Sequence, residues 1–200
     1  MSKKDYQLVS LIGFLVGFLI LWPLTNLGLK INFLKGALSV FGFTVFAPFA
    51  LWLINILSRF FPILKQFGKF AAVGTLNTLL DLGVLNFLIF LSGLASGVFY
   101  VVFKAISFLI ATTNSYFWNK FWTFQSRLPV SLNEYIRFAI FTLVGTLINV
   151  SVASLIVNVI GPPVGFSPKL WANIGALIAV FCSFMWNFLS YRQIVFKSNK

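Results

Sequence analysis

The sequence predicts an all-α membrane protein with six transmembrane helices, and composition is the first reason. Apolar residues make up 60% of the 200 residues and charged residues only 9%, against about 25% charged in a typical soluble domain. The chain holds 26 Phe residues, and its mean hydropathy is +0.97. A transmembrane helix needs about 20 apolar residues. The chain therefore has room for about six spans and almost no water-soluble domain.

The second reason is the distribution of the apolar residues, which fall into six segments with short polar connections. The predicted spans are residues 8–24, 34–57, 70–91, 101–122, 135–160 and 170–189. The first segment follows two lysines, as the apolar part of a signal peptide would. However, the chain continues with Trp22-Pro23-Leu24, and no small-residue cleavage site follows the apolar stretch. We therefore expect this segment to remain as a helix.

The cations predict the orientation of the spans, because short cytoplasmic loops are enriched in Lys and Arg. Eleven cations share the side of the N-terminus, and four lie on the other side. The first group is Lys3, Lys4, Arg59, Lys65, Lys69, Lys120, Arg127, Arg137, Arg192, Lys197 and Lys200; the second is Lys30, Lys35, Lys104 and Lys169. We expect both termini to be cytoplasmic and the protein to lie in the cell membrane.

The charged residues also exclude several classes of function. The net charge is +12, but the cations lie between apolar runs, so they indicate anionic lipid headgroups rather than nucleic acid. The chain has no His, and its only acids are Asp5, Asp81 and Glu134. A catalytic triad, a His-ligated metal and a pair of catalytic carboxylates all lack their residues. The sequence therefore predicts no enzyme, no metal and no cofactor, and Cys182 can form no internal disulfide.

The last two-thirds of the chain contain an internal repeat. The string Val73-Gly74-Thr75-Leu76 recurs 71 residues later from Val144 to Leu147, and an Asn follows each copy (Asn77 and Asn149). The following spans end alike at an offset of 72 residues, in segments 115–124 and 187–196. Both predicted hairpins start and finish on the cytoplasmic side, so we expect a parallel repeat, an arrangement known in transporters.

The motifs in this repeat resemble those of the GtrA-like membrane proteins. The family pattern Phe-x-x-Val-Gly-x-x-Asn-x-x-x-Asp is present on Phe70, Val73, Gly74, Asn77 and Asp81. The Ala-Lys that opens the family's next helix resembles Lys104-Ala105 in reverse order. The family's helix ending, Asn-Phe-x-x-Asn-Arg-x-Trp-x-Phe, resembles Asn119, Lys120, Trp122 and Phe124, and again Asn187, Phe188, Arg192 and Phe196.

This resemblance covers residues 66–198 and implies a four-helix transmembrane domain there. Residues 1–62 then form an extra N-terminal hairpin, which departs from the family. The resemblance implies a role in cell-surface polysaccharide assembly, with members thought to move polyprenyl-phosphate-linked sugars across the membrane.

Polar residues near the bilayer midplane are the first candidate site. Asp81 is the only acid within a predicted span, where an ionised side chain costs about 2.5–3.5 kcal/mol on insertion scales. Asn77 shares its helix face, and we group Asn114 and Asn149 with this set. One interpretation is a proton-coupling or headgroup-binding site. The other is a hydrogen-bonded Asp that holds helices together.

Basic helix ends are the second candidate site, for a lipid phosphate. Lys104, at the outer start of its predicted span, either binds a phosphate there or snorkels into the interface. On the cytoplasmic side, Lys120 and Arg192 occupy equivalent repeat positions, and Asn119 and Asn187 lie in the same two helix endings. They either bind the phosphate together, Arg by bidentate hydrogen bonds and Lys by point charge, or serve as positive-inside anchors.

The leading functional hypothesis is the flipping of a polyprenyl-phosphate-linked sugar, or an accessory role in that step. The alternatives are a small proton-coupled exporter of hydrophobic cations and a non-transporting scaffold for a membrane glycosyltransferase. Four core helices can hardly enclose a glycolipid headgroup, so we expect a homo-oligomer or a complex with a membrane glycosyltransferase.

Overall fold

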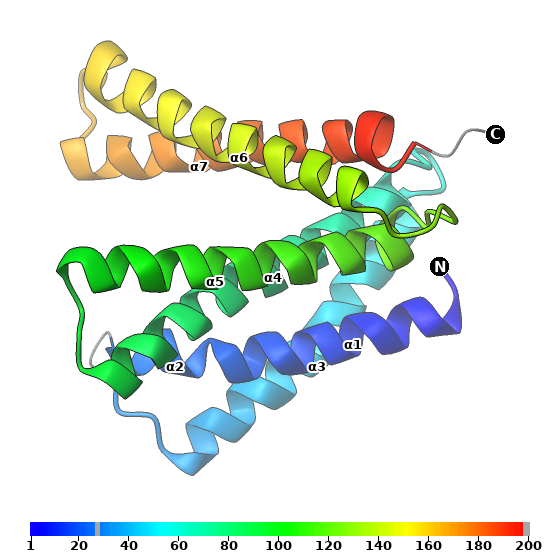
Figure 1. Cartoon of the computed structure of the whole chain (residues 1–200), viewed down its shortest axis with the longest axis horizontal. Coiled ribbons are helices and arrows are strands. Elements are labelled where there is room, and N and C mark those ends of the chain that lie inside the picture. Colours follow the sequence, from blue (N-terminus) through cyan, green and yellow to red (C-terminus); the bar gives the residue numbers. More distant parts are fainter. Residues whose placement is uncertain (27–28, 198–200) are drawn as a thin grey trace. The chain divides into compact units, whose positions relative to one another are not determined.

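A computed structural model describes residues 1–26 and 29–197, and the fold there is all-α, as predicted (Figure 1). Seven α-helices and three π-helical turns follow one another in this part of the chain. They are α1 (Lys3–Leu19), α2 (Leu21–Asn26), α3 (Phe33–Leu57), α4 (Leu64–Ser92), α5 (Gly97–Trp118), η1 (Asn119–Thr123), α6 (Leu132–Ser154), η2 (Leu155–Ile160), α7 (Pro168–Ser190) and η3 (Tyr191–Val195). Lys200, one of the cations counted above, and Ser198, the end of the region of resemblance, lie outside the described residues.

Six helical stretches within the described residues are long and apolar enough to span a membrane, which confirms the predicted fold class. They run over Lys3–Thr25, Phe33–Leu57, Leu64–Ser92, Gly97–Thr123, Leu132–Ile160 and Leu170–Val195. Most are longer than the predicted spans because the helices continue into the polar flanks. The orientation of the termini stays a prediction.

Side-chain caps fix where several of these helices begin. Ser2 accepts a hydrogen bond from the Asp5 N–H, and Asp5 in turn accepts one from the Ser2 N–H, which makes a capping box at the start of α1. Ser131 and Ser167 accept from backbone N–H groups at the starts of α6 and α7. At the other end of α4, Gly93 adopts a left-handed conformation with φ of 70° and stops the helix.

The chain forms two compact units, Met1–Gln125 and the part from Ser126 onward. In the first unit α1 packs antiparallel on α3, α4 packs on α5, and α1 also contacts α4 (Figure 1). Gly13 allows the close approach of α1 and α3, because a Cβ there would lie 2.2 Å from the carbonyl oxygen of Phe43. The predicted N-terminal hairpin therefore packs on the α4–α5 hairpin and shares a core with it: Val9, Ile12, Val16, Leu51, Val73, Leu76 and Trp122.

The second unit is the hairpin of α6 and α7. Two tryptophans of α7 donate hydrogen bonds to the segment formed by α6 and η2. The indole of Trp171 donates to the Ile156 carbonyl at 2.9 Å, and that of Trp186 donates to the Phe141 carbonyl at 3.3 Å. Ile156 lies in the π-helical turn η2, and its carbonyl also accepts from the Gly161 N–H. The Ile156 carbonyl therefore accepts two hydrogen bonds, one from the Trp171 indole and one from the Gly161 backbone.

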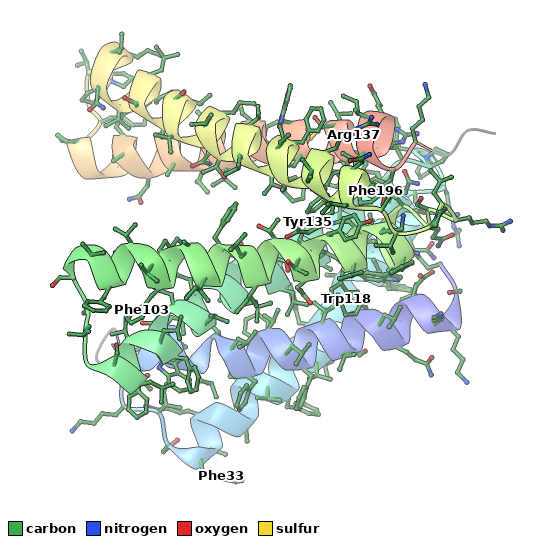
Figure 2. The ribbon with its side chains drawn as sticks, in the orientation of Figure 1. Phe33, Phe103, Trp118, Tyr135, Arg137 and Phe196 are labelled. Atoms are coloured by element: carbon green, nitrogen blue, oxygen red, sulfur yellow. The ribbon has the colours of Figure 1, made fainter. Side chains whose placement is uncertain are left out.

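Large apolar side chains cover the outside of the helices, as expected for a protein that faces lipid (Figure 2). Phe33 at the start of α3 is 93% exposed, and Phe41 and Phe46 further along the same helix are also exposed. A soluble protein rarely exposes large continuous apolar patches. Because hydrocarbon solvates these side chains, their exposure is consistent with six membrane spans.

The α4–α5 hairpin and the α6–α7 hairpin end in the same local backbone structure, a π-helical turn. The π-helical turn η1 spans residues 119–123, and η3 spans residues 191–195, 72 residues later. This offset equals the one between the two helix endings in the sequence. The shared turn supports the predicted repeat, which itself stays a prediction. Such π-helical turns are frequent at functional sites.

Candidate functional site

An ion pair and a hydrogen bond join α4 to α5 at the predicted midplane site. The Asp81 carboxylate forms an ion pair with the ammonium group of Lys104 and accepts a hydrogen bond of 2.6 Å from the Ser107 hydroxyl. Ser107 is fully buried, whereas the side chains of Lys104 and Asp81 are 42% and 21% exposed. Both carboxylate oxygens of Asp81 therefore have partners on the neighbouring helix.

A hydrogen bond between two asparagine side chains lies one helical turn from this ion pair. The side-chain amide of Asn114 on α5 donates to the side-chain oxygen of Asn77 on α4 at 2.7 Å. Asn77 precedes Asp81 by four residues, which places both on one face of α4. The side-chain NH2 group of Asn77 (Nδ2) is buried without a hydrogen-bond partner among the described residues. The structure thus brings together Asn77, Asp81, Lys104 and Asn114, all of them predicted site residues.

The position of Lys104 differs from the sequence-based expectation. We expected Lys104 at the outer start of its span, but α5 begins at Gly97, so Lys104 lies about two turns inside the helix. Its ammonium group pairs with Asp81 there. Within the first unit, Lys104 is thus the counter-ion of the midplane acid.

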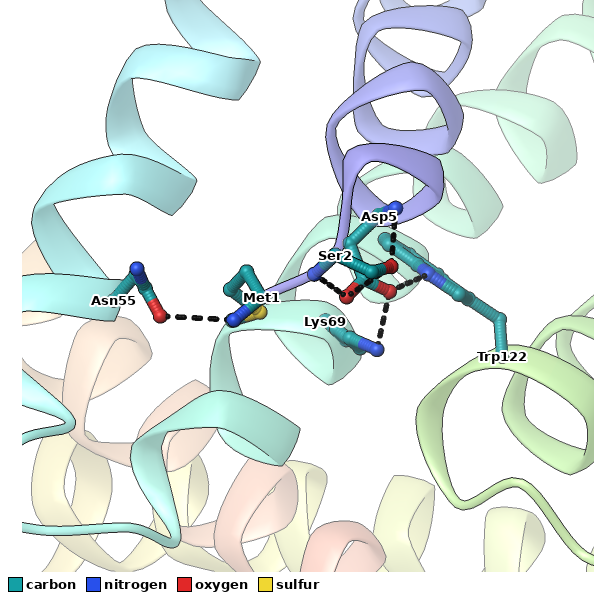
Figure 3. Close-up of polar contacts among 6 residues, drawn as sticks. All are labelled: Met1, Ser2, Asp5, Asn55, Lys69 and Trp122. Carbon is teal, nitrogen blue, oxygen red and sulfur yellow. Dashed lines mark hydrogen bonds and ion pairs between the residues drawn. The ribbon is translucent and has the colours of Figure 1, made fainter.

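A second charged cluster lies at the other end of the same unit, where the sequence predicts the cytoplasmic side (Figure 3). Asp5 of α1 forms an ion pair of 2.5 Å with Lys69 of α4, and both side chains are buried. The same Asp5 oxygen, Oδ1, accepts a hydrogen bond of 3.0 Å from the Trp122 indole. The Lys69 ammonium group also lies 5.5 Å from the centre of the Trp122 ring, a cation–π contact.

Sequence reasoning missed this cluster of Asp5, Lys69 and Trp122. We counted Lys69 among the cations of the cytoplasmic side, and we named Trp122 as part of the family's helix ending. Lys69 is 5% exposed and Trp122 also 5%, so both are buried within the first unit instead of lying at its outer surface. The capping box at Ser2 and Asp5 could have drawn attention to Asp5, but a partner 64 positions away leaves no local signal.

The π-helical turn η1 buries the predicted phosphate-binding residues of the first hairpin. Lys120 is fully buried, with its ammonium group 5.9 Å from the Tyr116 ring centre. Asn119 is also buried, and its amide donates to the Ser115 carbonyl at 2.9 Å. Trp122 and Thr123 of the same turn are buried as well. The burial of Lys120 differs from both sequence-based interpretations, because each of them needs its ammonium group at the membrane surface.

The corresponding residues of the second hairpin are arranged differently. Arg192 in η3 is exposed. Asn187 packs over Gly145, where a Cβ would lie 2.3 Å from the Asn187 side-chain oxygen. Asn149 donates to the Ser183 hydroxyl at 3.4 Å. Lys120 and Arg192 belong to different units, so their convergence on one phosphate stays a prediction.

Two cavities of the first unit adjoin Asp5, and they differ in character. The larger has a volume of about 470 Å³ and combines an aromatic wall with polar groups. Trp118, Trp122 and Phe121 supply aromatic surface, and Lys4 and Asn114 supply polar groups. The smaller, of about 280 Å³, is lined mainly by polar side chains of α1, α4 and η1. Cavities that pair apolar walls with a few polar groups are typical ligand sites.

Residues 69–196 match the family described as "GtrA/DPMS, transmembrane domain". The chain belongs to this family. The match begins at Lys69 and ends at Phe196, close to the predicted region of 66–198, and it leaves out α1, α2 and α3. GtrA-like proteins are in general non-catalytic membrane proteins, and family membership points to the handling of polyprenyl-phosphate sugars.

A relative from Bacillus subtilis (strain 168) extends this comparison. The chain is 32% identical over 133 residues to the "Uncharacterized membrane protein YngA", and the alignment covers 66% of the chain and 80% of the relative. No solved structure matches the chain. In the first unit, the GtrA/DPMS match contains Lys69, Asp81, Lys104 and Trp122, whereas Asp5 lies outside it.

Proposed function

We propose that this GtrA/DPMS protein moves a polyprenyl-phosphate-linked sugar across the cell membrane, alone or as the accessory subunit of that step. The lipid would serve the synthesis of surface polysaccharide or the glycosylation of the cell wall. The observation that carries the proposal is the polar series on α4 and α5: the Asn77–Asn114 pair followed by Asp81 with Ser107 and Lys104.

A flippase must lower the free energy of a phosphate and a sugar within hydrocarbon. Polar groups inside membrane spans are costly, and they mark pathways more often than they serve packing alone. Asn77 retains a buried N–H donor without a partner among the described residues. The Lys104 side chain is 42% exposed, so its ammonium group can be reached beside the ion pair. A donor and a cation are the groups that sugar hydroxyls and a phosphate would use.

The larger cavity gives this polar series an entrance at the predicted cytoplasmic end. Asn114 lines the cavity and also donates to Asn77, so one side chain belongs to both the cavity and the midplane pair. The indole and phenyl rings of Trp118, Trp122 and Phe121 offer flat apolar surface, which suits the carbon face of a sugar ring. The polyprenyl chain would remain in the surrounding lipid.

Partner proteins are part of the proposal. The first unit has four spans, and the cavity reaches only one end of them. We therefore propose a homo-oligomer, or a complex with the membrane glycosyltransferase that makes or uses the lipid. A cation exporter is less well supported, because such a mechanism needs an accessible acid, and both oxygens of Asp81 are bonded to α5.

Reconstitution in vesicles tests the function. Purified protein, with and without a co-expressed partner glycosyltransferase, is incorporated into vesicles that carry a fluorescent polyprenyl-phosphate sugar. The expected result is faster transbilayer movement than in protein-free vesicles and competition by the unlabelled lipid. An unlabelled polyprenol without phosphate is the control and should not compete. Movement at the protein-free rate in both preparations would argue for a scaffold without transport activity.

A further inference from the structure

The smaller cavity of the first unit has the side chains of an anion site. Its polar lining comes from three parts of the first unit: Ser2 and Asp5 at the start of α1, Lys65, Gln66 and Lys69 of α4, and Thr123 and Gln125 at η1 and just after it. Lys65 is exposed at the rim, whereas Lys69 is 5% exposed. The first turn of α4 also brings the positive end of the helix dipole to this cavity.

A buried hydroxyl group in the cavity lacks a partner. Thr123 is 2% exposed, and its hydroxyl oxygen makes no hydrogen bond with any described residue. A buried polar group without a partner costs about 1–3 kcal/mol, so such groups need an explanation. A ligand oxygen in the cavity would supply the missing acceptor.

The Asp5 carboxylate is an anion that is already bound to two donors beside this cavity. Its Oδ1 receives both the Lys69 ammonium group and the Trp122 indole N–H (Figure 3). Both donors belong to the GtrA/DPMS match, and the acceptor belongs to the N-terminal hairpin outside it. The family domain thus carries a converging pair of donors, and the added hairpin supplies the anion that they hold.

We propose that this cavity binds a phosphate group through Lys65, Lys69 and Thr123, and that Asp5 is a built-in competitor for Lys69. Phosphate has more acceptor oxygens than a carboxylate and carries at least as much negative charge, so it can engage a lysine and a hydroxyl at once. While Asp5 neutralises Lys69, the cavity holds phosphate weakly. When Asp5 turns away, Lys69 becomes available to the ligand.

The phosphate could belong to a lipid headgroup or to a free anion. The assignment of the phosphate to a lipid headgroup rests on the proposed function, in which a polyprenyl phosphate enters at this end of the first unit. The phosphate site itself does not depend on transport. Its test therefore uses inorganic phosphate and a polyprenyl monophosphate as separate probes.

The experiment is a binding titration with the full chain in dodecyl maltoside micelles, followed by phosphorus NMR. Asp5→Asn should raise the affinity for inorganic phosphate about tenfold or more, because it frees a charged donor. Thr123→Val, which removes only the hydroxyl, should lower the affinity about tenfold. Lys3→Gln is the matched control: it removes one exposed charge at the same end without lining the cavity, and it should leave the affinity within about twofold.

Asp5→Asn leaves Lys69 buried and unpaired, so the variant could lose its fold, and Thr123→Val is the second, gentler test. Equal affinities in the wild type, Asp5→Asn and Thr123→Val for both probes would overturn the proposal. A loss of affinity in Lys3→Gln as large as that in Thr123→Val would overturn it too. Effects with the lipid probe alone support a lipid phosphate. If the variants change binding but vesicles show no lipid movement, the site stands and the transport function fails.

Discussion

The two hairpins of the GtrA/DPMS domain share a motif and a closing π-helical turn, but they use different chemistry between their helices. The first hairpin joins α4 to α5 through the Asp81–Lys104 ion pair and the Asn77–Asn114 pair. The second joins α6 to α7 through neutral contacts, Thr142 with Tyr191 at 2.6 Å and Asn149 with Ser183. Charge within the described spans of this domain is thus concentrated in the first hairpin.

The repeat offsets show where the second hairpin lacks this charge. At an offset of 71, Asp81 corresponds to Val152 and Lys69 to Ile140; at 72, Lys104 corresponds to Ala176 and Trp122 to Ile194. Ile140 and Ile194 are half exposed, whereas Lys69 and Trp122 are buried against Asp5. The first hairpin thus carries both charged clusters and the attachment of the N-terminal hairpin, whereas the corresponding positions of the second hairpin are apolar.

The largest expected effect comes from breaking the buried ion pair of the first hairpin. Lys69→Met leaves the Asp5 carboxylate buried without its cation, which should lower the free energy of unfolding by about 3–5 kcal/mol. Denaturant titration in micelles measures it. Ile140→Met at the equivalent, lipid-exposed position of the second hairpin should change stability by less than about 0.5 kcal/mol. Adding Asp5→Asn to Lys69→Met should restore most of the loss, and equal losses in the two hairpins would contradict the comparison.

The next effect concerns the equivalent cations Lys120 and Arg192. Arg192 is exposed, so Arg192→Ala should weaken binding of a polyprenyl phosphate by about 1.5–3 kcal/mol, one charge-assisted hydrogen bond, and leave folding intact. Lys120 is fully buried, so Lys120→Ala should reduce both binding and stability. The exposed Lys197→Ala provides the charge-matched control. Unchanged binding in Arg192→Ala would make this residue a topological anchor only.

A smaller effect is expected at the midplane. Asp81→Ala removes an ion pair and the Ser107 hydrogen bond, but Lys104 is 42% exposed, so the loss of stability should be only about 1–2 kcal/mol. Val152→Ala, at the equivalent position of the second hairpin, is the comparison for side-chain truncation. Thermal unfolding of the two variants side by side gives the difference. A loss in Val152→Ala that exceeds the loss in Asp81→Ala would show that packing, not charge, dominates there.

The smallest effect tests the neutral contact of the second hairpin. Thr142→Val keeps the shape of the side chain and removes its hydrogen bond with the Tyr191 hydroxyl, which should cost about 1 kcal/mol. Tyr191→Phe should cost a similar amount, and the double variant should cost less than the sum, because both changes remove the same bond. Additive losses in the double variant would mean that the hydroxyl groups do not act together.

Composition was sufficient to predict the fold class, and motif spacing was sufficient to predict which candidate site residues share a helix face. Six spans follow from apolar length alone, and the positions of Asn77 and Asp81 on one face follow from helical periodicity. The positions of Lys69 and Lys120 did not follow, because loop cations usually lie in water. What buries Lys69 is a carboxylate 64 positions away, and Lys120 lies in a π-helical turn that no local residue pattern specified.

In the proposed function, the first hairpin carries the path of the lipid-linked sugar. The most direct test is the rate of transbilayer movement of a labelled polyprenyl-phosphate sugar in vesicles with Asp81→Ala or Thr142→Val protein. Both variants lose a contact between paired helices at a similar expected cost in stability, but only Asp81 belongs to the polar series. We expect Asp81→Ala to reduce the rate to that of protein-free vesicles and Thr142→Val to retain the wild-type rate. Wild-type movement in Asp81→Ala, or equal loss in both variants, would contradict it.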